Sequence, residues 1–210
     1  MVDINFNKRT LREKETDKEH HLKPTWAKFT GHVKTATAAA LFGDDGGDEE
    51  YLSLIDEFYP TVSGKVLEIG AGTGFLAKKI LEKNENVEYT VLDIEKNIPY
   101  VQSMLKDFPD VQYISSKNYK DIFSQEWDLL IETHCLSETP IYYYTDILNN
   151  ISTKACFVID YGGDPNDPDF DTTLNNWFEK FPNREKKMNM NLLGAAKRGG
   201  IPVYIGKNEK

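Results

Sequence analysis

The sequence predicts an α/β fold, a Rossmann-like, doubly wound and mostly parallel sheet with an N-terminal helical extension. Three observations support this expectation. Short apolar runs typical of buried strands alternate with amphipathic runs of helical period, the connections between them are short, and a glycine-rich turn follows the first strand. Alternating strands and helices with short connections produce right-handed crossovers between parallel strands, and helices then cover both faces of the sheet. That arrangement is the doubly wound class.

The individual elements follow from this periodicity in chain order. An alanine-rich run at 26–42 and an amphipathic run at 49–59 predict two helices, with a loop rich in glycine and aspartate between them. Further along, apolar runs predict six strands, at 65–69, 87–92, 111–114, 127–131, 155–159 and 201–205. Amphipathic runs between them predict helices at 75–83, 98–107, 141–150 and 172–181. We therefore expect a helical cap or arm over residues 1–60 and a Rossmann-like domain over residues 61–210.

Composition restricts the classes of partner. The formal net charge is -9, from 25 Lys and Arg against 34 Asp and Glu. Proteins that bind nucleic acid usually present a basic face to the phosphates, so we expect no nucleic-acid partner. No apolar run reaches the roughly 20 residues of a membrane span, and the first residues lack the apolar core of a signal peptide. We therefore expect a cytoplasmic protein that does not associate with membranes.

Metal binding is not expected from the sequence. The two cysteines, Cys135 and Cys156, make neither a Cys-x-x-Cys pair nor a disulfide framework. Asp160, Asp164 and Asp167 follow the fifth expected strand and could converge on an ion, but loops this rich in Asp, Gly and Pro are usually solvated turns. We therefore assign no residue of the chain to a metal site.

The run Val66-Leu67-Glu68-Ile69-Gly70-Ala71-Gly72-Thr73-Gly74 connects the first strand to a helix. Glycines let the backbone turn tightly and leave no side chain between the main chain and a ligand, and the helix that follows presents free N–H groups and the positive end of its dipole. Asp93 ends the second expected strand, where a carboxylate can accept both hydroxyls of a ribose. The dinucleotide fingerprint Gly-x-Gly-x-x-Gly needs glycine where this chain has Phe75, whose ring would crowd a pyrophosphate. The spacing therefore favours a nucleoside cofactor without phosphates.

The segment Glu68-Ile69-Gly70-Ala71-Gly72-Thr73-Gly74 resembles the first motif of class I S-adenosylmethionine-dependent methyltransferases, acid-x-Gly-x-Gly-x-Gly, and Asp93 matches their acidic second motif. The resemblance extends over roughly residues 66–161. It implies S-adenosylmethionine as the cofactor and S-adenosylhomocysteine as the product. The cofactor-binding residues it implies are Glu68, Gly70, Ala71, Gly72 and Gly74 at the methionine end, Asp93 at the ribose, Ile94 and Ser116 at the adenine, and Glu132 at the end of the fourth strand.

The fourth expected strand ends in the polar junction Glu132-Thr133-His134-Cys135-Leu136-Ser137-Glu138. Methyl transfer from a sulfonium mostly needs positioning, but an alcohol acceptor must also lose its proton, and a base with a pKa near neutral helps. His134 suits that role, with Glu132 to assist or orient it; alternatively, His134 only bonds to the backbone at the strand end. The junction also resembles that of bacterial sugar O-methyltransferases, which implies that Ser137 and Glu138 lie near the acceptor. The candidate catalytic residues are therefore His134, Glu132 and Glu138.

Three functions are compatible with the sequence. The first is O-methylation of a small-molecule acceptor, such as a sugar or a sugar-derived metabolite, because the junction lacks the Asn/Asp-Pro-Pro-Tyr motif of many methyltransferases that act on amino groups. The second is a non-catalytic or regulatory subunit that binds S-adenosylmethionine, because the tail after the fifth strand is short for a closing strand pair and an acceptor wall. The third is an NAD(P)-binding oxidoreductase.

Overall fold

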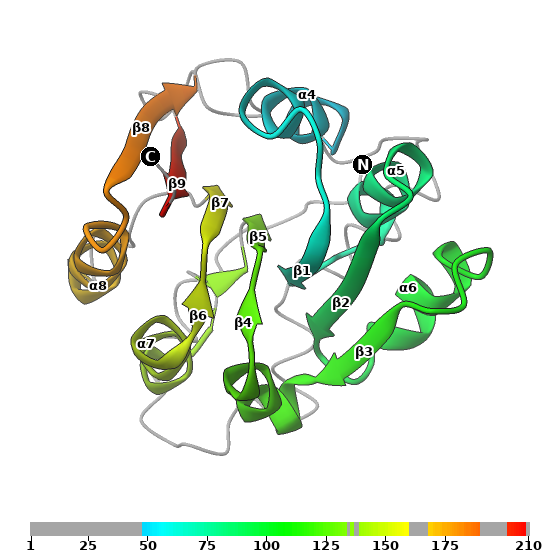
Figure 1. Ribbon diagram of the computed structural model, residues 1–210. Helices are drawn as coiled ribbons and strands as arrows, with labels where there is room; N and C mark the ends of the chain where they lie inside the picture. Colours follow the sequence, from blue (N-terminus) through cyan, green and yellow to red (C-terminus); the bar gives the residue numbers. More distant parts are fainter. Residues whose placement is uncertain (1–47, 134, 137–138, 160–167, 190–200, 209–210) are drawn as a thin grey trace, which may run out of the picture.

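The computed structural model of the chain describes residues 48–133, 135–136, 139–159, 168–189 and 201–208 (Figure 1). Its strands are β1 (Gly64–Ile69), β2 (Val87–Asp93), β3 (Gln112–Ser115), β4 (Glu126–Trp127), β5 (Leu129–Thr133), β6 (Ser152–Thr153), β7 (Ala155–Ile159), β8 (Asn183–Asn189) and β9 (Ile201–Lys207). Its helices are α4 (Asp48–Phe58), α5 (Phe75–Lys83), α6 (Ile98–Met104), α7 (Ile141–Asn150) and α8 (Pro168–Phe178), with 3₁₀ turns in η2 (Ser116–Ser124).

The main sheet has the order β3-β2-β1-β5-β7-β9-β8, and a separate short ladder joins β4 to β6. The first five strands of that order pair in parallel, β9 is antiparallel to β7, and β8 is antiparallel to β9. This confirms the Rossmann-like, mostly parallel sheet expected from the sequence. Of the expected cap over residues 1–60, the helix α4 and the segment that leads from it to β1 are described; the helix expected at 26–42 lies outside the described residues.

Buried apolar side chains cover both faces of the sheet. Successive residues of a strand point to opposite faces, and Val66 and Leu67 of β1 accordingly belong to two different clusters of buried side chains. The first cluster contains side chains of α4, α5 and α6, and the second contains side chains of α7 and α8. Figure 1 shows these two groups of helices on opposite sides of the strands. Strands buried on both faces explain the continuous apolar runs in the sequence.

Three predicted elements differ from the structure by more than a small shift at their ends. The fourth strand is interrupted at Asp128, because that residue lies in a bend between β4 and β5. The helix predicted at 98–107 ends at Met104, ahead of Pro109, which disfavours a helical conformation in the residue before it. The helix predicted at 172–181 is α8, which begins at Pro168 and ends at Phe178; proline is well suited to the first turn of a helix.

The edge strand β8 was not predicted from the sequence. Its residues, Asn-Arg-Glu-Lys-Lys-Met-Asn, are mostly polar or charged, and it pairs with β9 from Asn183 opposite Lys207 to Asn189 opposite Ile201. An edge strand has one partner and one open side, and charged side chains there discourage pairing with other chains. The strands β8 and β9 form a closing antiparallel pair, so the expectation that the tail was too short for such a pair was wrong.

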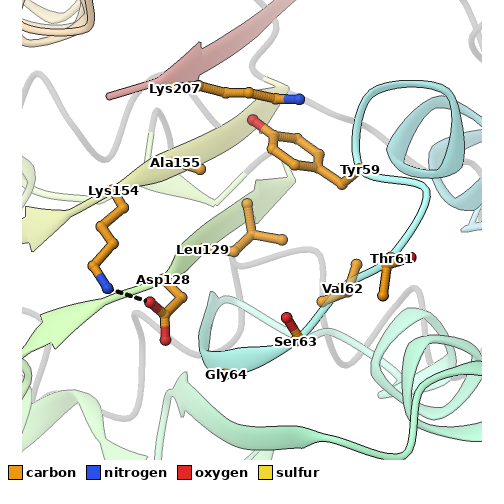
Figure 2. Close-up of a pocket in the computed structure, with 10 residues that line it drawn as sticks. All are labelled: Tyr59, Thr61, Val62, Ser63, Gly64, Asp128, Leu129, Lys154, Ala155 and Lys207. Carbon is orange, nitrogen blue, oxygen red and sulfur yellow. Dashed lines mark hydrogen bonds and ion pairs between the residues drawn. The ribbon is translucent and has the colours of Figure 1, made fainter. Parts of the chain in front are cut away.

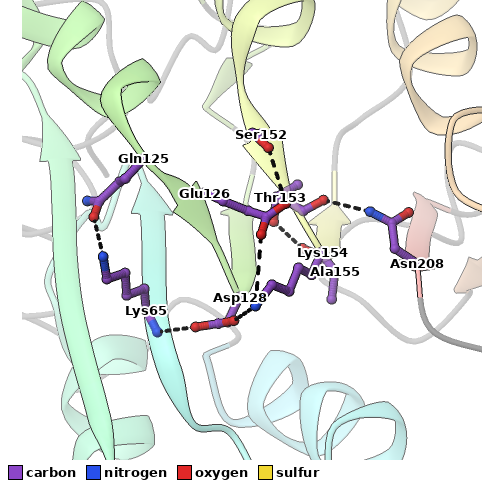
Figure 3. Close-up of polar contacts among 9 residues, drawn as sticks. All are labelled: Lys65, Gln125, Glu126, Asp128, Ser152, Thr153, Lys154, Ala155 and Asn208. Atoms are coloured by element: carbon purple, nitrogen blue, oxygen red, sulfur yellow. Dashed lines mark hydrogen bonds and ion pairs between the residues drawn. The ribbon is translucent and has the colours of Figure 1, made fainter.

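At the amino ends of the strands, Asp128 lies just before β5 and forms hydrogen bonds to β1 and to the residue before β7 (Figure 3). Its Oδ2 accepts a hydrogen bond from the Lys65 N–H at 2.8 Å, and its Oδ1 accepts one from Lys154 Nζ at 2.7 Å. The hydrogen bond from Lys154 is the main reason that the pKa of the Asp128 carboxyl lies below its usual value. Gly64 makes room for this carboxylate, because a Cβ at Gly64 would lie 2.2 Å from Asp128 Oδ2. Gly64 also has a φ of +77°, which favours glycine.

We expect the substitution Gly64→Ala to lower the free energy of unfolding by roughly 2–3 kcal/mol, because the left-handed backbone becomes strained and the Asp128 side chain is displaced. In an Asp128→Ala background the same substitution should cost only the backbone part, about 1–2 kcal/mol. Urea unfolding of the four proteins measures both costs. Equal costs in the two backgrounds would contradict the steric role of Asp128.

The contribution of Asp128 to stability should depend on pH. Its folded pKa is lowered, so the stabilisation is present above the unfolded value of about 3.9 and is lost as the pH falls through the folded value. We expect the difference in unfolding free energy between the unaltered protein and Asp128→Asn to be constant near pH 7 and to shrink below about pH 4. Denaturant unfolding at pH 7, 5, 4 and 3 tests this, and a difference that is the same at every pH would refute it.

Candidate functional site

The turn between β1 and α5 has left-handed backbone at its glycines. Gly70, Gly72 and Gly74 have φ values of +76°, +60° and +78°, which residues with a side chain rarely adopt. The Gly70 N–H donates to the Leu92 carbonyl at 2.8 Å, and the Gly74 N–H donates to the Ala71 carbonyl at 2.8 Å. The glycines therefore keep the turn tight and hold it against the end of β2, the neighbour of β1 in the sheet.

Gly74 also allows α6 to pack closely. A Cβ at Gly74 would lie 3.0 Å from Cγ1 of Val101, a buried residue of α6. The next residue, Phe75, begins α5, and its N–H donates to Thr73 Oγ1 at 3.3 Å. The resemblance assigned Gly74 to the methionine end of a cofactor; in the structure, a side chain at this position would meet α6.

Asp93 is the last residue of β2, and its side chain is held by three donors. Its Oδ1 accepts from the Ile94 N–H at 2.6 Å, and its Oδ2 accepts from Asn97 Nδ2 at 2.8 Å and from the Gly72 N–H at 3.3 Å. The residue is only 4% exposed. Each carboxylate oxygen can accept about two hydrogen bonds, so Oδ1 keeps capacity for a hydroxyl group of a ligand.

Glu68 is almost completely buried near the end of β1. Its Oε2 accepts a hydrogen bond from the Tyr89 hydroxyl of β2 at 3.0 Å. Tyr89 belongs to the core cluster that includes α4 and α5, as does Val66, two residues before Glu68 on the strand. Alternation along β1 therefore directs the Glu68 carboxylate toward that face of the sheet.

Ile94 and Ser116 follow the ends of β2 and β3. The register of the two strands pairs Asp93 with Ser115, so Ser116 lies at the same edge of the sheet as Asp93. Ile94 and Ser116 are both buried. The carboxyl ends of parallel strands are where doubly wound proteins bind ligands, and the structure brings these two predicted adenine contacts to that edge.

Glu132 fixes the turn after β5. It is fully buried, and its Oε1 accepts hydrogen bonds from the N–H groups of Cys135 at 2.5 Å and Leu136 at 2.8 Å. Glu132 pairs in register with Ile69, the last residue of β1 before the glycine turn. The carboxylate therefore shapes the junction next to the expected cofactor site.

His134, Ser137 and Glu138 of the predicted junction lie outside the described residues. So do Asp160, Asp164 and Asp167 after β7, which the sequence did not assign to a site. Within the parts of the chain that the structure describes, no three His, Cys, Asp or Glu side chains come together as a metal site would require. In the same parts, every helix is too short or too polar to cross a bilayer.

Sequence analysis missed two side chains near this edge. Asn97 is fully buried and donates to both the Gly72 carbonyl and Asp93. Tyr143 of α7 is buried, and burial, followed by the nearby Cys135 and Asp93, holds its pKa well above the usual value. Asn97 directly precedes a helix whose first turn contains proline, and this pattern could have identified Asn97 as the N-cap residue of α6. Three consecutive tyrosines in α7 did not indicate which one faces this edge.

A pocket of about 360 Å³ lies at the opposite edge, around the amino ends of β1, β5 and β7 (Figure 2). The charged groups on its wall are engaged within the protein: Lys154 Nζ bonds to Asp128 at 2.7 Å, and Lys207 Nζ donates to the Phe58 carbonyl at 2.6 Å. The predicted cofactor and catalytic residues that the structure describes do not line this pocket. The carboxyl edge of the sheet is therefore the candidate site.

The family model of the methyltransferase small domain matches residues 32–139, a little over half of the 210 residues. This chain belongs to the methyltransferase small-domain family. Membership of a methyltransferase family bears out S-adenosylmethionine, the methyl donor that the sequence motifs predict.

Solved structures show that this methyltransferase-family chain has a widespread fold. The N-methyltransferase NodS from Bradyrhizobium japonicum WM9, solved with S-adenosylhomocysteine, has a TM-score of 0.56 and 14% identity, over 81% of this chain and 91% of that one. An O-methyltransferase family protein from Burkholderia thailandensis has a TM-score of 0.60 and 9% identity, over 89% of this chain and 62% of that one. At these identities the likeness shows the fold alone.

A curated relative matches in sequence over a shorter part. The ribosomal RNA small subunit methyltransferase A of Clostridium botulinum (strain ATCC 19397 / Type A) is 30% identical over 91 residues. The match covers 43% of this methyltransferase-family chain and 33% of the relative. The chain thus spans about a third of the length of that protein.

Replacing Asp93 should remove most of the affinity for the cofactor. The substitution Asp93→Ala leaves a ribose hydroxyl without its acceptor, and losing a hydrogen bond to a charged group costs about 1.5–3 kcal/mol, so the Kd for S-adenosylhomocysteine should rise roughly 10- to 150-fold. Calorimetry measures it, with Asp128→Ala at the opposite edge as a control that should keep the Kd unchanged. Unaltered affinity in Asp93→Ala would exclude Asp93 from the cofactor site.

Proposed function

We propose that this chain transfers the methyl group of S-adenosylmethionine to a hydroxyl group of a small molecule, such as a sugar or a sugar-derived metabolite. One observation carries the proposal: three buried carboxylates, those of Glu68, Asp93 and Glu132, lie at or near the carboxyl ends of three neighbouring strands beside a left-handed glycine turn. Ligands of doubly wound sheets bind at this edge. Such an edge suits an adenosine held by its ribose, with the sulfonium directed toward a second substrate.

Each part of the cofactor has a candidate partner along this edge. Asp93 would accept a ribose hydroxyl at its Oδ1, Ile94 would pack against the adenine, and Ser116 would bond to the adenine edge. The backbone of the turn at 70–72 has no bulky side chain to obstruct the methionine part, whose ammonium group suits the carboxylate of Glu68. None of these partners is a phosphate-binding cation, which agrees with a nucleoside cofactor.

The proposed reaction is an in-line displacement at the methyl carbon. The acceptor oxygen bonds to that carbon, the carbon–sulfur bond breaks, and its electron pair stays on sulfur, which gives the neutral thioether of S-adenosylhomocysteine. The acceptor proton passes to a base, for which we propose His134 after β5. Glu132 positions the turn that carries His134 through its hydrogen bonds to the backbone of Cys135 and Leu136. Glu138 would orient the acceptor.

Two features favour a hydroxyl on a small molecule. The junction at 132–135 is Glu-Thr-His-Cys and not the Asn/Asp-Pro-Pro-Tyr motif typical of transfer to amino groups of bases. The formal net charge of -9 is unfavourable for contact with an RNA backbone. Both features come from the sequence of this chain and not from a relative.

Methylation of RNA is the second candidate function. The observation that favours it is the 30% identity to a protein named as a ribosomal RNA methyltransferase, over 43% of this chain. A regulatory subunit that binds the cofactor without transferring a methyl group is a third possibility. The sequence favoured such a subunit because the tail looked too short for a closing strand pair. The pairing of β8 with β9 shows that the tail does form this pair.

A transfer assay with radiolabelled S-adenosylmethionine separates these functions. The acceptors are a panel of monosaccharides and nucleotide sugars, and a transcript of small-subunit ribosomal RNA. We expect label in the sugar fraction and none in the RNA. Label in the RNA would overturn the proposed acceptor, and cofactor binding without transfer to any acceptor would support a regulatory subunit.

The substitution His134→Ala should lower kcat by about 10²- to 10⁴-fold, the usual contribution of a general base, while the Kd for S-adenosylhomocysteine stays within a factor of two of the unaltered protein's. The neighbouring substitution Cys135→Ala is the control and should leave kcat nearly unchanged. Steady-state kinetics with the acceptor found above measures both. An undiminished kcat in His134→Ala would remove this residue as the base.

A further inference from the structure

Asn97 has a hydrogen-bond arrangement that its place in the chain does not require. It stands at the N-cap of α6, where an asparagine side chain ordinarily accepts a backbone N–H of the first helical turn. Here the side chain makes no such cap bond. Its amide Nδ2 instead donates to the Gly72 carbonyl at 2.7 Å and to Asp93 Oδ2 at 2.8 Å.

The orientation of this amide leaves its oxygen unused. Asn97 is 0% exposed, and its Oδ1 is buried without a hydrogen-bond partner among the described residues. A buried acceptor without a donor destabilises a protein. Capping the helix would have given Oδ1 a donor, so the observed orientation favours the two donor bonds over helix capping.

The two acceptors of Asn97 are both parts of the expected cofactor site. Gly72 belongs to the glycine turn, and its own N–H also donates to Asp93 Oδ2, at 3.3 Å. Asn97, Gly72 and Asp93 therefore form a closed triangle of hydrogen bonds that joins the turn after β1 to the end of β2. We call these three residues the clamp.

The clamp assigns different roles to the two oxygens of Asp93. Oδ2 accepts two hydrogen bonds, from Asn97 and Gly72, which is about the capacity of one carboxylate oxygen. Oδ1 accepts one, from the Ile94 N–H, and retains an acceptor site. Rotation of the carboxylate would break bonds on both oxygens, so the clamp fixes the direction in which the free site points.

We propose that Asn97 is a positioning residue of the cofactor site: it clamps the glycine turn to Asp93 and so directs Asp93 Oδ1 toward a hydroxyl of the cofactor ribose. This inference rests on the assignment of S-adenosylmethionine as cofactor and deepens it. Asn97 itself does not touch the ribose, because its side chain is fully enclosed by the protein. The effect of Asn97 passes through Asp93. Selectivity for a ribose over a deoxyribose therefore depends on Asn97.

The test compares Asn97→Ala with Asn84→Ala, a matched control. The amide of Asn84 also makes two hydrogen bonds, donating to the Ile80 carbonyl at 2.8 Å and accepting from the Val62 N–H at 3.2 Å, but it lies at the other end of α5 from the glycine turn. Calorimetry on the full chain measures the Kd of S-adenosylhomocysteine and of its 2′-deoxy and 3′-deoxy forms. Melting temperatures without ligand separate a loss of binding from a loss of folding.

We expect the unaltered protein and Asn84→Ala to prefer S-adenosylhomocysteine to at least one deoxy form by about tenfold or more. In Asn97→Ala the affinity for S-adenosylhomocysteine should fall about tenfold, while that for the disfavoured deoxy form changes much less, so the preference nearly disappears. Added to Asp93→Ala, Asn97→Ala should cause no further loss, because its effect passes through that carboxylate.

Two results overturn the proposal. An unchanged Kd in Asn97→Ala is one, and an equal loss of affinity for all three ligands is the other, because that would show a general structural role. If Asn97→Ala does not fold, Asn97→Leu, which is similar in shape and has no N–H donor or charge, is held to the same expectations. Failure of the unaltered protein to bind S-adenosylhomocysteine would overturn the cofactor assignment together with this inference. If the unaltered protein binds it, the results with Asn97→Ala test only the role of Asn97.

Discussion

The hydrogen bonds to the Asp93 carboxylate are the interactions on which the carboxyl edge of the sheet depends. They bring together a backbone N–H of the glycine turn, the backbone N–H of the residue after β2, and the amide of a residue at the start of α6. The turn reaches Asp93 only because Gly70, Gly72 and Gly74 adopt left-handed backbone. One carboxylate thus holds three segments in place, and the same segments line the expected cofactor site.

The two edges of the sheet use aspartate in different ways. At the amino edge, Asp128 pairs with Lys154 and with the backbone of β1, so its charge is balanced inside the protein. At the carboxyl edge, the donors to Asp93 are two backbone N–H groups and an amide, all of them neutral. None of these donors is a cation, and Asp93 Oδ1 retains an acceptor site. Asp128 is therefore paired with a cation of the protein, whereas Asp93 is held by uncharged donors only.

Much of the fold could be predicted because it follows from local patterns. Strands buried on both faces consist of continuous apolar residues, so β1, β2, β5 and β7 were found near their observed positions. The edge strand β8 has no apolar run that would reveal it, because its residues are mostly polar or charged. It is a strand because it pairs with β9, and that pairing cannot be seen in the local sequence. Likewise, the interruption of the fourth strand at Asp128 depends on contacts with Lys65 and Lys154, which lie far away in the sequence.

By itself, the sequence determined the class of fold, the place of the glycine turn and the acid at the end of β2, because backbone freedom, periodicity and residue type are local properties of the chain. Only the tertiary structure decided that Asn97 turns away from its own helix toward Gly72 and Asp93. It also decided that Tyr143 lies near Asp93, and that Glu132 folds back onto the turn after β5. A side chain takes the direction in which its polar atoms find partners in a buried site, and those partners are supplied by other strands and helices brought together by the fold.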